Sequence, residues 1–266
     1  MIREGNVEGE MVLEGRRFNL QDFQGVFLRL MDQNMLPEVE GESANSSTRL
    51  HADAIHAHLV LWTEIGNGRF VNRPRAMASN LSKPYQAQII QEVGLRVPET
   101  LITNDPEEVR KFHAKKKNII YKSMSGVRSI VQCLESGEVD RLENIRWCAT
   151  QFQECIKGQN VRVHVVGRKA FATAIQSDAT DYRYATRQGH SPAQLSSIQL
   201  PAETEAKCVN LASRLGLALA GIDLMVEPNG ATYCFEVNPC PAFNYYEEET
   251  GAPISQAIAQ HLVGQD

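Results

Sequence analysis

Two acidic residues and an amide near the end of this 266-residue chain form the first arrangement that could do chemistry. Asp223 and Glu236 stand in two apolar-rich runs that flank Asn229-Gly230. Asn-Gly between apolar runs is a strong signal of a β-hairpin with a two-residue loop. Such a loop places Asp223 directly opposite Glu236. Asn238 then shares their face of the hairpin, because side chains alternate along a strand.

Carboxylates that face each other across a hairpin repel unless a cation compensates them. Two carboxylates and an amide oxygen are hard ligands that suit Mg²⁺, which also keeps waters and substrate phosphates in its coordination shell. We therefore expect Asp223, Glu236 and Asn238 to bind magnesium, with Mn²⁺ as a second candidate. The alternative is that they are solvated residues of an ordinary hairpin. The opposite face is expected to pack on a core through Ile222, Leu224, Val226, Tyr233, Phe235 and Val237.

The strings GIDLMV and EVNPCPAF in this region resemble the metal-binding end of ATP-grasp enzymes, where a G-x-D strand precedes an E-x-N-x-x-P strand end. The branch that they resemble contains RimK-type glutamate ligases and graspetide synthetases, and the resemblance spans roughly residues 70–262. It implies an α/β (α+β) ATP-grasp fold at 79–266, in which two α/β subdomains clasp ATP. The lid subdomain would cover about 97–155 and the metal-binding subdomain about 156–266. Residues 1–78 would form a reduced N-terminal α/β segment.

Several helices and strands must position these residues. Apolar periodicity predicts a helix over 49–65 with Ala54, Ile55, His58, Leu59 and Trp62 toward the core. Ser82 is a good N-cap for a helix that stops at Gly94. A strand is expected at 95–103, and a helix should follow the cap at Asp105.

Two lysines are candidates for binding phosphate. Lys83 lies near the positive end of the helix after Ser82, a place that suits anions, and the resemblance implies a phosphate-contacting lysine there. Lys122 ends an apolar strand and could hold its ammonium over a nucleotide phosphate. Ser125 and Gly126 in the loop after it offer further donors, although ATP-grasp enzymes usually have more glycines in this loop. A surface lysine and a plain hairpin are the alternatives.

The resemblance implies further roles in binding the nucleotide and in the reaction. Glu154 and Cys155 fall at the hinge whose backbone recognises adenine, and Asn160 stands where an acid usually binds the ribose. Arg162 corresponds to an arginine near the transferred phosphate or the acceptor carboxylate, and Arg183 to one that reaches the nucleotide phosphates. A core strand and a solvated loop are the alternatives at the hinge and at Arg183.

Composition limits the other classes of function. The net charge of −5 argues against a general affinity for nucleic acid or for anionic membranes. The chain contains no apolar run of membrane-spanning length, and its six cysteines have no C-x-x-C spacing, so we expect reduced thiols in a cytoplasmic protein. The sequence has no GxxxxGK[ST] motif, which excludes a P-loop enzyme.

Three functional hypotheses follow from the resemblance. The first is an ATP- and Mg²⁺-dependent ligase that activates a carboxylate as an acyl phosphate and joins it to an amine, with amino acids or a peptide as substrates. The second is a macrocyclase that forms ester or amide crosslinks in a precursor peptide. The third is a non-catalytic nucleotide-binding partner protein. A homo-oligomer is compatible with each of them.

Overall fold

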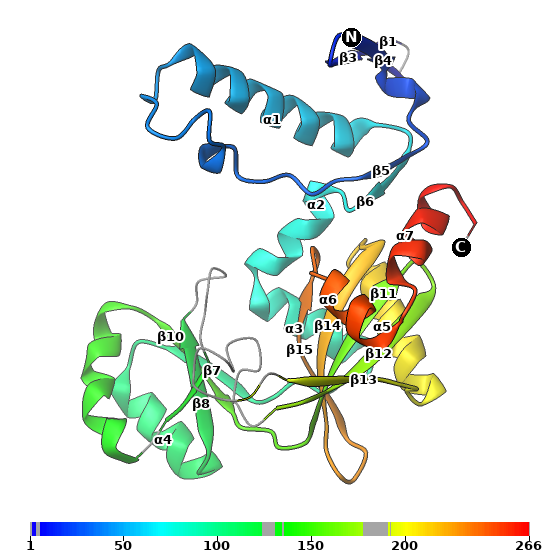
Figure 1. Ribbon diagram of the computed structural model, residues 1–266. Helices are drawn as coiled ribbons and strands as arrows, with labels where there is room; N and C mark the ends of the chain where they lie inside the picture. The colour runs from blue at the N-terminus through cyan, green and yellow to red at the C-terminus, as the bar shows by residue number, and fades with distance from the viewer. Residues whose placement is uncertain are drawn as a thin grey trace.

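The computed structural model describes residues 2–3, 6–123, 131–134, 136–177, 191 and 193–265. Two β-sheets, each with helices packed on it, lie side by side, and the N-terminal segment lies above them in the view of Figure 1. One sheet has the order β7-β10-β8-β9 and the other the order β13-β12-β11-β14-β15. The strands of the first are β7 (Thr100–Thr103), β10 (Thr150–Glu154), β8 (Ile119–Ser123) and β9 (Gln132–Cys133), and those of the second are β13 (Gln194–Ile198), β12 (Lys169–Gln176), β11 (Gln159–Val166), β14 (Leu219–Val226) and β15 (Thr232–Asn238).

Helices cover one face of the five-stranded sheet and part of the other. Helices α3 (Lys83–Glu92) and α5 (Ala202–Arg214) pack on one face over a continuous apolar core. Alternation along β11 sends Val161, Val163 and Val165 into this core, and each is at most 2% exposed. The opposite face is partly covered by α6 (Asn244–Thr250) and α7 (Ile254–Leu262). The even-numbered residues of β11 therefore point toward α6 and α7.

The four-stranded sheet lies within residues 97–155, the range expected for the lid. Helix α4 (Pro106–Lys116) and the 3₁₀ helix η4 (Ser136–Trp147) pack on one face of it, around Phe152 and Ile119. Asp105 caps α4 by accepting from the Glu107 amide, as expected. Because side chains alternate, the neighbours of Phe152 and Tyr121 face the other way, away from these helices.

The strand expected at 95–103 is shorter in the structure and begins only at Thr100. The preceding residues instead line the outer edge of β15, where Arg96 pairs with Tyr233. The Arg96 carbonyl accepts from the Cys234 amide at 2.8 Å. Pro98 separates the two parts and cannot donate to a ladder, so the segment is divided between the two sheets.

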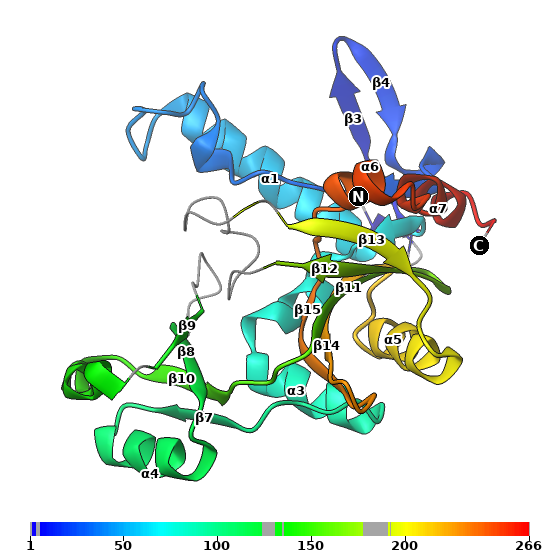
Figure 2. The ribbon, with the colours of Figure 1, turned by 60° about the horizontal axis from the view of Figure 1, so that its bottom comes forward.

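The N-terminal segment carries a hairpin of β3 (Glu10–Leu13) and β4 (Arg16–Asn19) that projects from the body (Figure 2). Strands β5 (Gly25–Phe27) and β6 (Arg69–Val71) pair in parallel and flank the long helix α1 (Ser47–Ile65). Trp62 of α1 is buried as predicted. Ile55, Ala54 and His58 are exposed, so that part of the prediction is wrong, because α1 packs through the neighbouring side of its surface. No helix within the described ranges is long and apolar enough to cross a membrane.

The hairpin of β14 and β15 confirms that Asp223 lies opposite Glu236. Its loop differs from the predicted one, because Glu227 pairs with Ala231 across three residues that end at Gly230, whose φ is +85°. A bulge between Leu224 and Asp223 then shifts the register back by one residue. The two shifts cancel at the acidic pair.

Between the loop and the bulge, however, the predicted faces of β15 are exchanged. Cys234 is opposite Leu224 and fully buried, whereas Tyr233 and Phe235 are only partly buried. The core therefore receives Cys234 where the sequence predicted the two aromatic rings.

Candidate active site

Four polar residues form one row across the five-stranded sheet. Thr173 of β12 pairs with Arg162 of β11, Arg162 with Asp223 of β14, and Asp223 with Glu236 of β15. Register partners on adjacent strands point to the same face, which here is the face opposite the α3/α5 core. The structure thus places Arg162, which lies 61 residues from Asp223 in the sequence, on the same sheet face as the two predicted metal ligands Asp223 and Glu236.

One ion pair lies within this row, and a second one joins Glu236 of the row to Lys83 of α3. Arg162 Nη1 donates to Asp223 Oδ1 at 2.5 Å, and Lys83 Nζ donates to Glu236 Oε2 at 2.7 Å. The Arg162 side chain is 7% exposed, and the other three are between 20% and 24% exposed. Lys83 reaches Glu236 from the first turn of α3, which Ser82 caps as predicted. Each carboxylate of the facing pair therefore has its own cationic partner, which compensates their mutual repulsion.

Gly221 leaves the space that Arg162 occupies. A Cβ built on Gly221 would overlap the Arg162 guanidinium and lie 2.7 Å from Pro241 Cβ. The glycine of the G-x-D motif is therefore required by the close approach of Arg162 and not by a turn. The absence of a side chain at Gly221 leaves room for the guanidinium that donates to Asp223.

The oxygen donors of the row fit a hard divalent cation. Asn238 follows Glu236 on the same face, opposite Gly221, and its Oδ1 accepts from the Cys240 amide at 2.9 Å. Two carboxylates that are register partners, with an amide oxygen one pleat further, match the ligands that Mg²⁺ uses when substrate phosphates complete its shell. The described residues contain no cluster of three or more His, Cys, Asp or Glu that would offer a competing metal site.

Two buried amides that sequence reasoning missed hold the acidic strand in place. Gln86 donates from Nε2 to the Val237 carbonyl at 2.8 Å and accepts from the Val237 amide at 3.0 Å, which fixes α3 to the edge of β15. Asn72 donates to the carbonyls of Leu219 and Pro239, both at 2.6 Å, and accepts from the Leu219 amide. Their positions before Pro74 and inside a helix carry no local signal of such long-range contacts.

His164 is a third buried residue that the sequence did not single out. It pairs with Gly221, is fully buried, and lies 4.7 Å from the Tyr246 ring in an edge-on arrangement. Nε2 lies 3.2 Å from the Ala242 carbonyl, so the neutral tautomer that donates from Nε2 fits this contact. Burial, followed by the positive charge of Arg162, lowers the pKa of His164 to about 3. His164 is therefore neutral and anchors the segment that follows Asn238.

The four-stranded sheet presents Lys122 on the face opposite α4. Lys122 pairs with Gln151 of β10, and the two residues are 9% and 4% exposed. Gln151 Oε1 has no hydrogen-bond partner within the described part of the chain, which is unusual for a buried amide. Gln151 was not predicted, although its alternation with Phe152 indicates that it points away from the α4 core. Ser125, Gly126 and Arg183 lie outside the described residues.

The predicted adenine hinge has much of its hydrogen-bonding capacity in use. The Glu154 amide donates to the Glu99 carbonyl at 3.0 Å, and the Cys155 amide donates to the Asn118 carbonyl at 3.1 Å. The Glu154 carboxylate accepts from the Glu99 amide and from Lys116. Because their amides already donate, the backbone carbonyl oxygens of Glu154 and Cys155 are the groups suited to accept a hydrogen bond from adenine.

Asn160 lies on the same face of β11 as Arg162. It pairs with Ile175 of β12 and Met225 of β14, and it is partly buried. An asparagine oxygen at this position can accept one hydrogen bond from a ribose hydroxyl.

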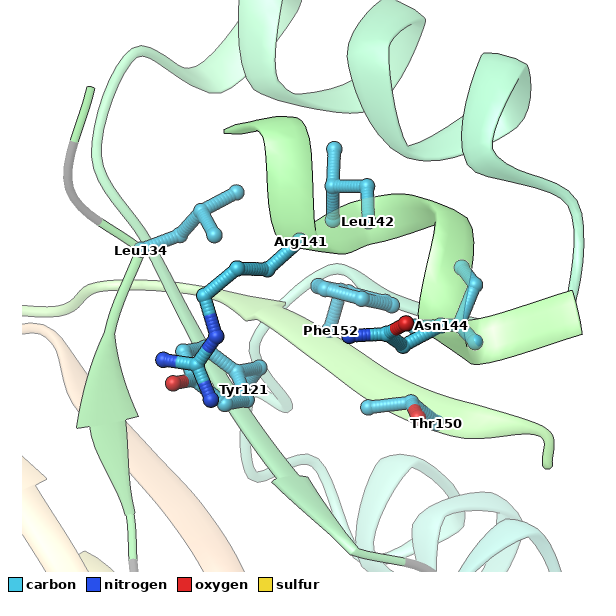
Figure 3. Close-up of a pocket in the computed structure, with 8 residues that line it drawn as sticks. Tyr121, Leu134, Arg141, Leu142, Asn144, Thr150 and Phe152 are labelled. Atoms are coloured by element: carbon cyan, nitrogen blue, oxygen red, sulfur yellow. The ribbon is translucent and has the colours of Figure 1, made fainter. Parts of the chain in front are cut away.

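A separate cavity of about 160 Å³ lies between the four-stranded sheet and η4 (Figure 3). Leu134, Leu142 and Phe152 provide apolar walls, and the Arg141 side chain extends toward Tyr121. Because Tyr121 and Phe152 point to the α4 side of the sheet, this cavity is on the opposite side of β8 and β10 from Lys122. It is not part of the polar row.

The comparison with protein families gives one match over most of the chain. A family model described as the RimK-like ATP-grasp domain matches residues 81–262. A probable alpha-L-glutamate ligase from Vibrio atlanticus (strain LGP32) is 24% identical over 203 residues, which are 72% of this chain and 66% of the relative. One from Haemophilus ducreyi (strain 35000HP / ATCC 700724) is 31% identical over 137 residues, which are 51% of this chain and 41% of the relative. The chain thus spans slightly less than two thirds of the length of the relative from Vibrio atlanticus.

Solved structures match a larger part of the chain. The ATP-grasp ligase PsnB, complexed with a minimal precursor, has a TM-score of 0.70 and 30% identity, and the match covers 83% of this chain and 72% of PsnB. The macrocyclase MdnC from Microcystis aeruginosa MRC, bound with the precursor peptide MdnA, has a TM-score of 0.80 and 25% identity over 99% of this chain and 86% of MdnC. The match to MdnC, at 99% of this chain, includes the N-terminal segment, which the family model leaves out.

Proposed function

This chain belongs to the RimK-like ATP-grasp family, and on that basis we propose that it is an ATP- and Mg²⁺-dependent ligase that joins a carboxylate to an amine. The observation that carries the proposal is the row of Arg162, Asp223 and Glu236 on one sheet face, completed by Lys83. It combines two cationic groups that suit phosphate oxygens with two carboxylates that suit a divalent metal.

The proposed reaction has two steps. A carboxylate oxygen of the substrate attacks the γ-phosphorus of ATP, and the bond to the β-phosphate oxygen breaks, which gives an acyl phosphate and ADP. The amine nitrogen of the second substrate then attacks the acyl carbon, phosphate leaves, and the amine loses a proton. Phosphoryl transfer depends mainly on positioning and charge neutralisation, and Mg²⁺, when bound, neutralises charge on the phosphate oxygens.

The residues of the candidate site have the following proposed roles. Asp223, Glu236 and Asn238 would hold the metal, and Arg162 orients Asp223 and would bind a phosphate or carboxylate oxygen. Lys122 binds phosphate from the lid sheet, so that the nucleotide lies between the two sheets. Glu154 and Cys155 contribute backbone carbonyl groups toward the base, and Asn160 accepts from the ribose. Ser125, Gly126 and Arg183 are proposed to contact the phosphates.

A peptide macrocyclase is the second candidate function. PsnB and MdnC, which were solved with a precursor and a precursor peptide, resemble this chain over 83% and 99% of its length, whereas the glutamate ligase of Vibrio atlanticus matches 72% of it. The reaction has the same two steps, with both the carboxylate and the amine or hydroxyl supplied by one peptide.

Phosphate release and product mass together test these proposals. Wild-type protein is mixed with ATP, Mg²⁺ and candidate acceptors, which are amino acids and peptides with glutamate, aspartate, lysine, serine and threonine side chains. A ligase releases phosphate and adds an amino acid to its acceptor, whereas a macrocyclase releases phosphate and removes water from a single peptide. Nucleotide binding without phosphate release across the acceptor set would indicate the non-catalytic partner protein instead.

A further inference from the structure

We propose that Gln151 of β10 recognises the base of the nucleotide and makes the site specific for adenine over guanine. Its terminal amide would accept a hydrogen bond from the 6-amino group of adenine and donate one to N7 of the ring. This inference rests on the proposed function and deepens it, because it names a residue that selects ATP. It makes Gln151 a specificity-determining residue.

The side chain of Gln151 is buried without full use of its hydrogen-bonding capacity. The residue is 4% exposed, and its Oε1 has no hydrogen-bond partner among the residues that the structure describes. Gln153, the next residue on the same face of β10, is 6% exposed and donates from Nε2 to Thr100 Oγ1 at 2.9 Å. A buried amide oxygen without a donor lowers the stability of the fold. A ligand that supplies the donor would remove this cost.

Gln151 lies between the groups proposed for the base and for the phosphates. Its register partner on β8 is Lys122, which is proposed to bind phosphate. The hinge residues Glu154 and Cys155 stand at the end of the same strand and directly after it. A nucleotide with its base at the hinge and its phosphates near Lys122 would therefore pass over Gln151.

The same sheet face offers an apolar surface for an aromatic ring. Ile102 of β7 is the register partner of Gln151 on its other side, and Ile120 of β8 is the partner of Gln153. Register partners on adjacent strands share a face, so both isoleucines lie on the face of the amide. Ile102 is 38% exposed and can pack against the flat side of a base. Apolar side chains around a buried amide suit a ring that carries hydrogen-bonding groups on its edge.

The pattern of donors and acceptors on the base favours adenine. A glutamine amide can pair with the N6 amino group and with N7 of adenine at the same time. Guanine has O6 in place of the amino group, so both atoms of this edge are acceptors. Guanine at the same place would leave Gln151 Oε1 without a donor and set it against another acceptor. Rotation of the flexible Gln151 side chain can turn Oε1 toward the base.

Isothermal titration calorimetry with ADP and GDP in the presence of Mg²⁺ tests this assignment. Wild-type protein is expected to bind ADP at least about tenfold more tightly than GDP, because guanine leaves a buried acceptor unpaired. Gln151→Met keeps the length of the side chain but has no amide. It should bind ADP about tenfold more weakly, and its preference for ADP over GDP should fall about tenfold. Gln151→Leu should behave in the same way.

Purine riboside diphosphate, which lacks the 6-amino group, separates base recognition from a structural role. Loss of the amino group should weaken binding to wild-type protein about tenfold more than binding to Gln151→Met. A merely structural role of Gln151 would make the two losses equal. Without nucleotide, Gln151→Met should unfold at the temperature of wild type or above it, because an apolar group replaces an unsatisfied amide.

Gln132→Met is the matched control for the loss of an amide. Gln132 is an exposed residue of β9 in the same sheet, and it accepts from the hydroxyl group of Tyr121 at 2.7 Å on the face toward α4. This variant should bind ADP and GDP as wild type does.

The outcomes separate the two proposals. If wild-type protein binds ADP and both Gln151 variants keep its ratio of affinities for ADP and GDP, only the assignment of Gln151 fails. Equal affinities of wild-type protein for ADP and GDP, or a preference for GDP, would overturn that assignment as well. If wild-type protein binds neither nucleotide, the proposed function fails with it.

Discussion

Arg162 and Asp223 are register partners on neighbouring strands, and Arg162 Nη1 donates to Asp223 Oδ1 at 2.5 Å. This contact fixes one carboxylate of the facing acidic pair while Lys83 holds the other. The acidic pair is stable in the fold because of these cations, and the same four side chains provide the charges that a metal–triphosphate complex requires.

Replacing Glu236 by glutamine should reduce turnover by at least about a hundredfold, as expected for a lost electrostatic group in an active site. The fold should persist, because Glu236 is partly exposed and lies outside the apolar core. Phosphate release and thermal unfolding measure the two effects. Glu249→Gln, at an exposed position of α6, is the control and should retain full activity. Magnesium-dependent turnover at the wild-type level in Glu236→Gln would contradict the metal assignment.

Lys122→Met should weaken ATP binding by about tenfold to a hundredfold, the cost of one charge-assisted hydrogen bond. Lys122 is 9% exposed beside Gln151, so the methionine retains the apolar stem of the side chain in the same place. Isothermal titration calorimetry with ATP and Mg²⁺ gives the affinity. Lys115→Met, on the exposed side of the same subdomain, should bind ATP as wild type does. Equal ATP affinities of the two variants would contradict the assignment of Lys122 to the nucleotide site.

Gly221→Ala should impair ATP and metal binding by displacing Arg162, and overpacking should lower the free energy of unfolding by about 1–3 kcal/mol. Ala220→Gly is the control at the next position, whose side chain points into the opposite core. It should cost about 1 kcal/mol of stability and leave ligand binding intact. Urea unfolding and calorimetry separate these outcomes. Normal ligand binding by Gly221→Ala would show that Arg162 needs no such space.

Because folding lowers the pKa of His164, we expect the stability of the protein to depend on pH. The unfolded chain binds a proton at this histidine below its ordinary pKa of 6.5, whereas the folded protein binds it only near a pKa of about 3. The unfolded state therefore carries more protons between these values, so stability decreases as the pH falls from 6.5 toward 3. Between pH 7 and pH 5.5 the loss should be about 1 kcal/mol.

Urea unfolding at the two pH values checks this dependence. His164→Gln should remove the His164 part of the loss, because glutamine does not titrate. His51→Gln, at an exposed position of α1, should keep the whole loss. The same change in stability with pH in all three proteins would contradict a buried neutral His164.

The acidic pair was predicted correctly because Asn229-Gly230 marks the hairpin and because the extra residue of the loop and the bulge cancel at Asp223 and Glu236. The bulge between Asp223 and Leu224 could not be predicted, because no nearby residue signals it, and neither could the burial of Cys234 in the core that accompanies it. The ion-pair partner of Glu236 could not be predicted either. Lys83 is 153 residues away in the sequence, and the packing of α3 against β15 brings the two side chains together. The exposed residues of α1 were misassigned because its apolar residues are spread around more than one side.

The position of the metal tests the account most directly. A crystal of the protein with a non-hydrolysable ATP analogue and Mn²⁺ would reveal the ion through its anomalous scattering. We predict an ion bound by oxygen atoms of Asp223 and Glu236 at about 2.0–2.2 Å, with phosphate oxygens completing its shell. An ion and triphosphate bound elsewhere, with Asp223 still paired to Arg162 and Glu236 to Lys83, would contradict the proposed site.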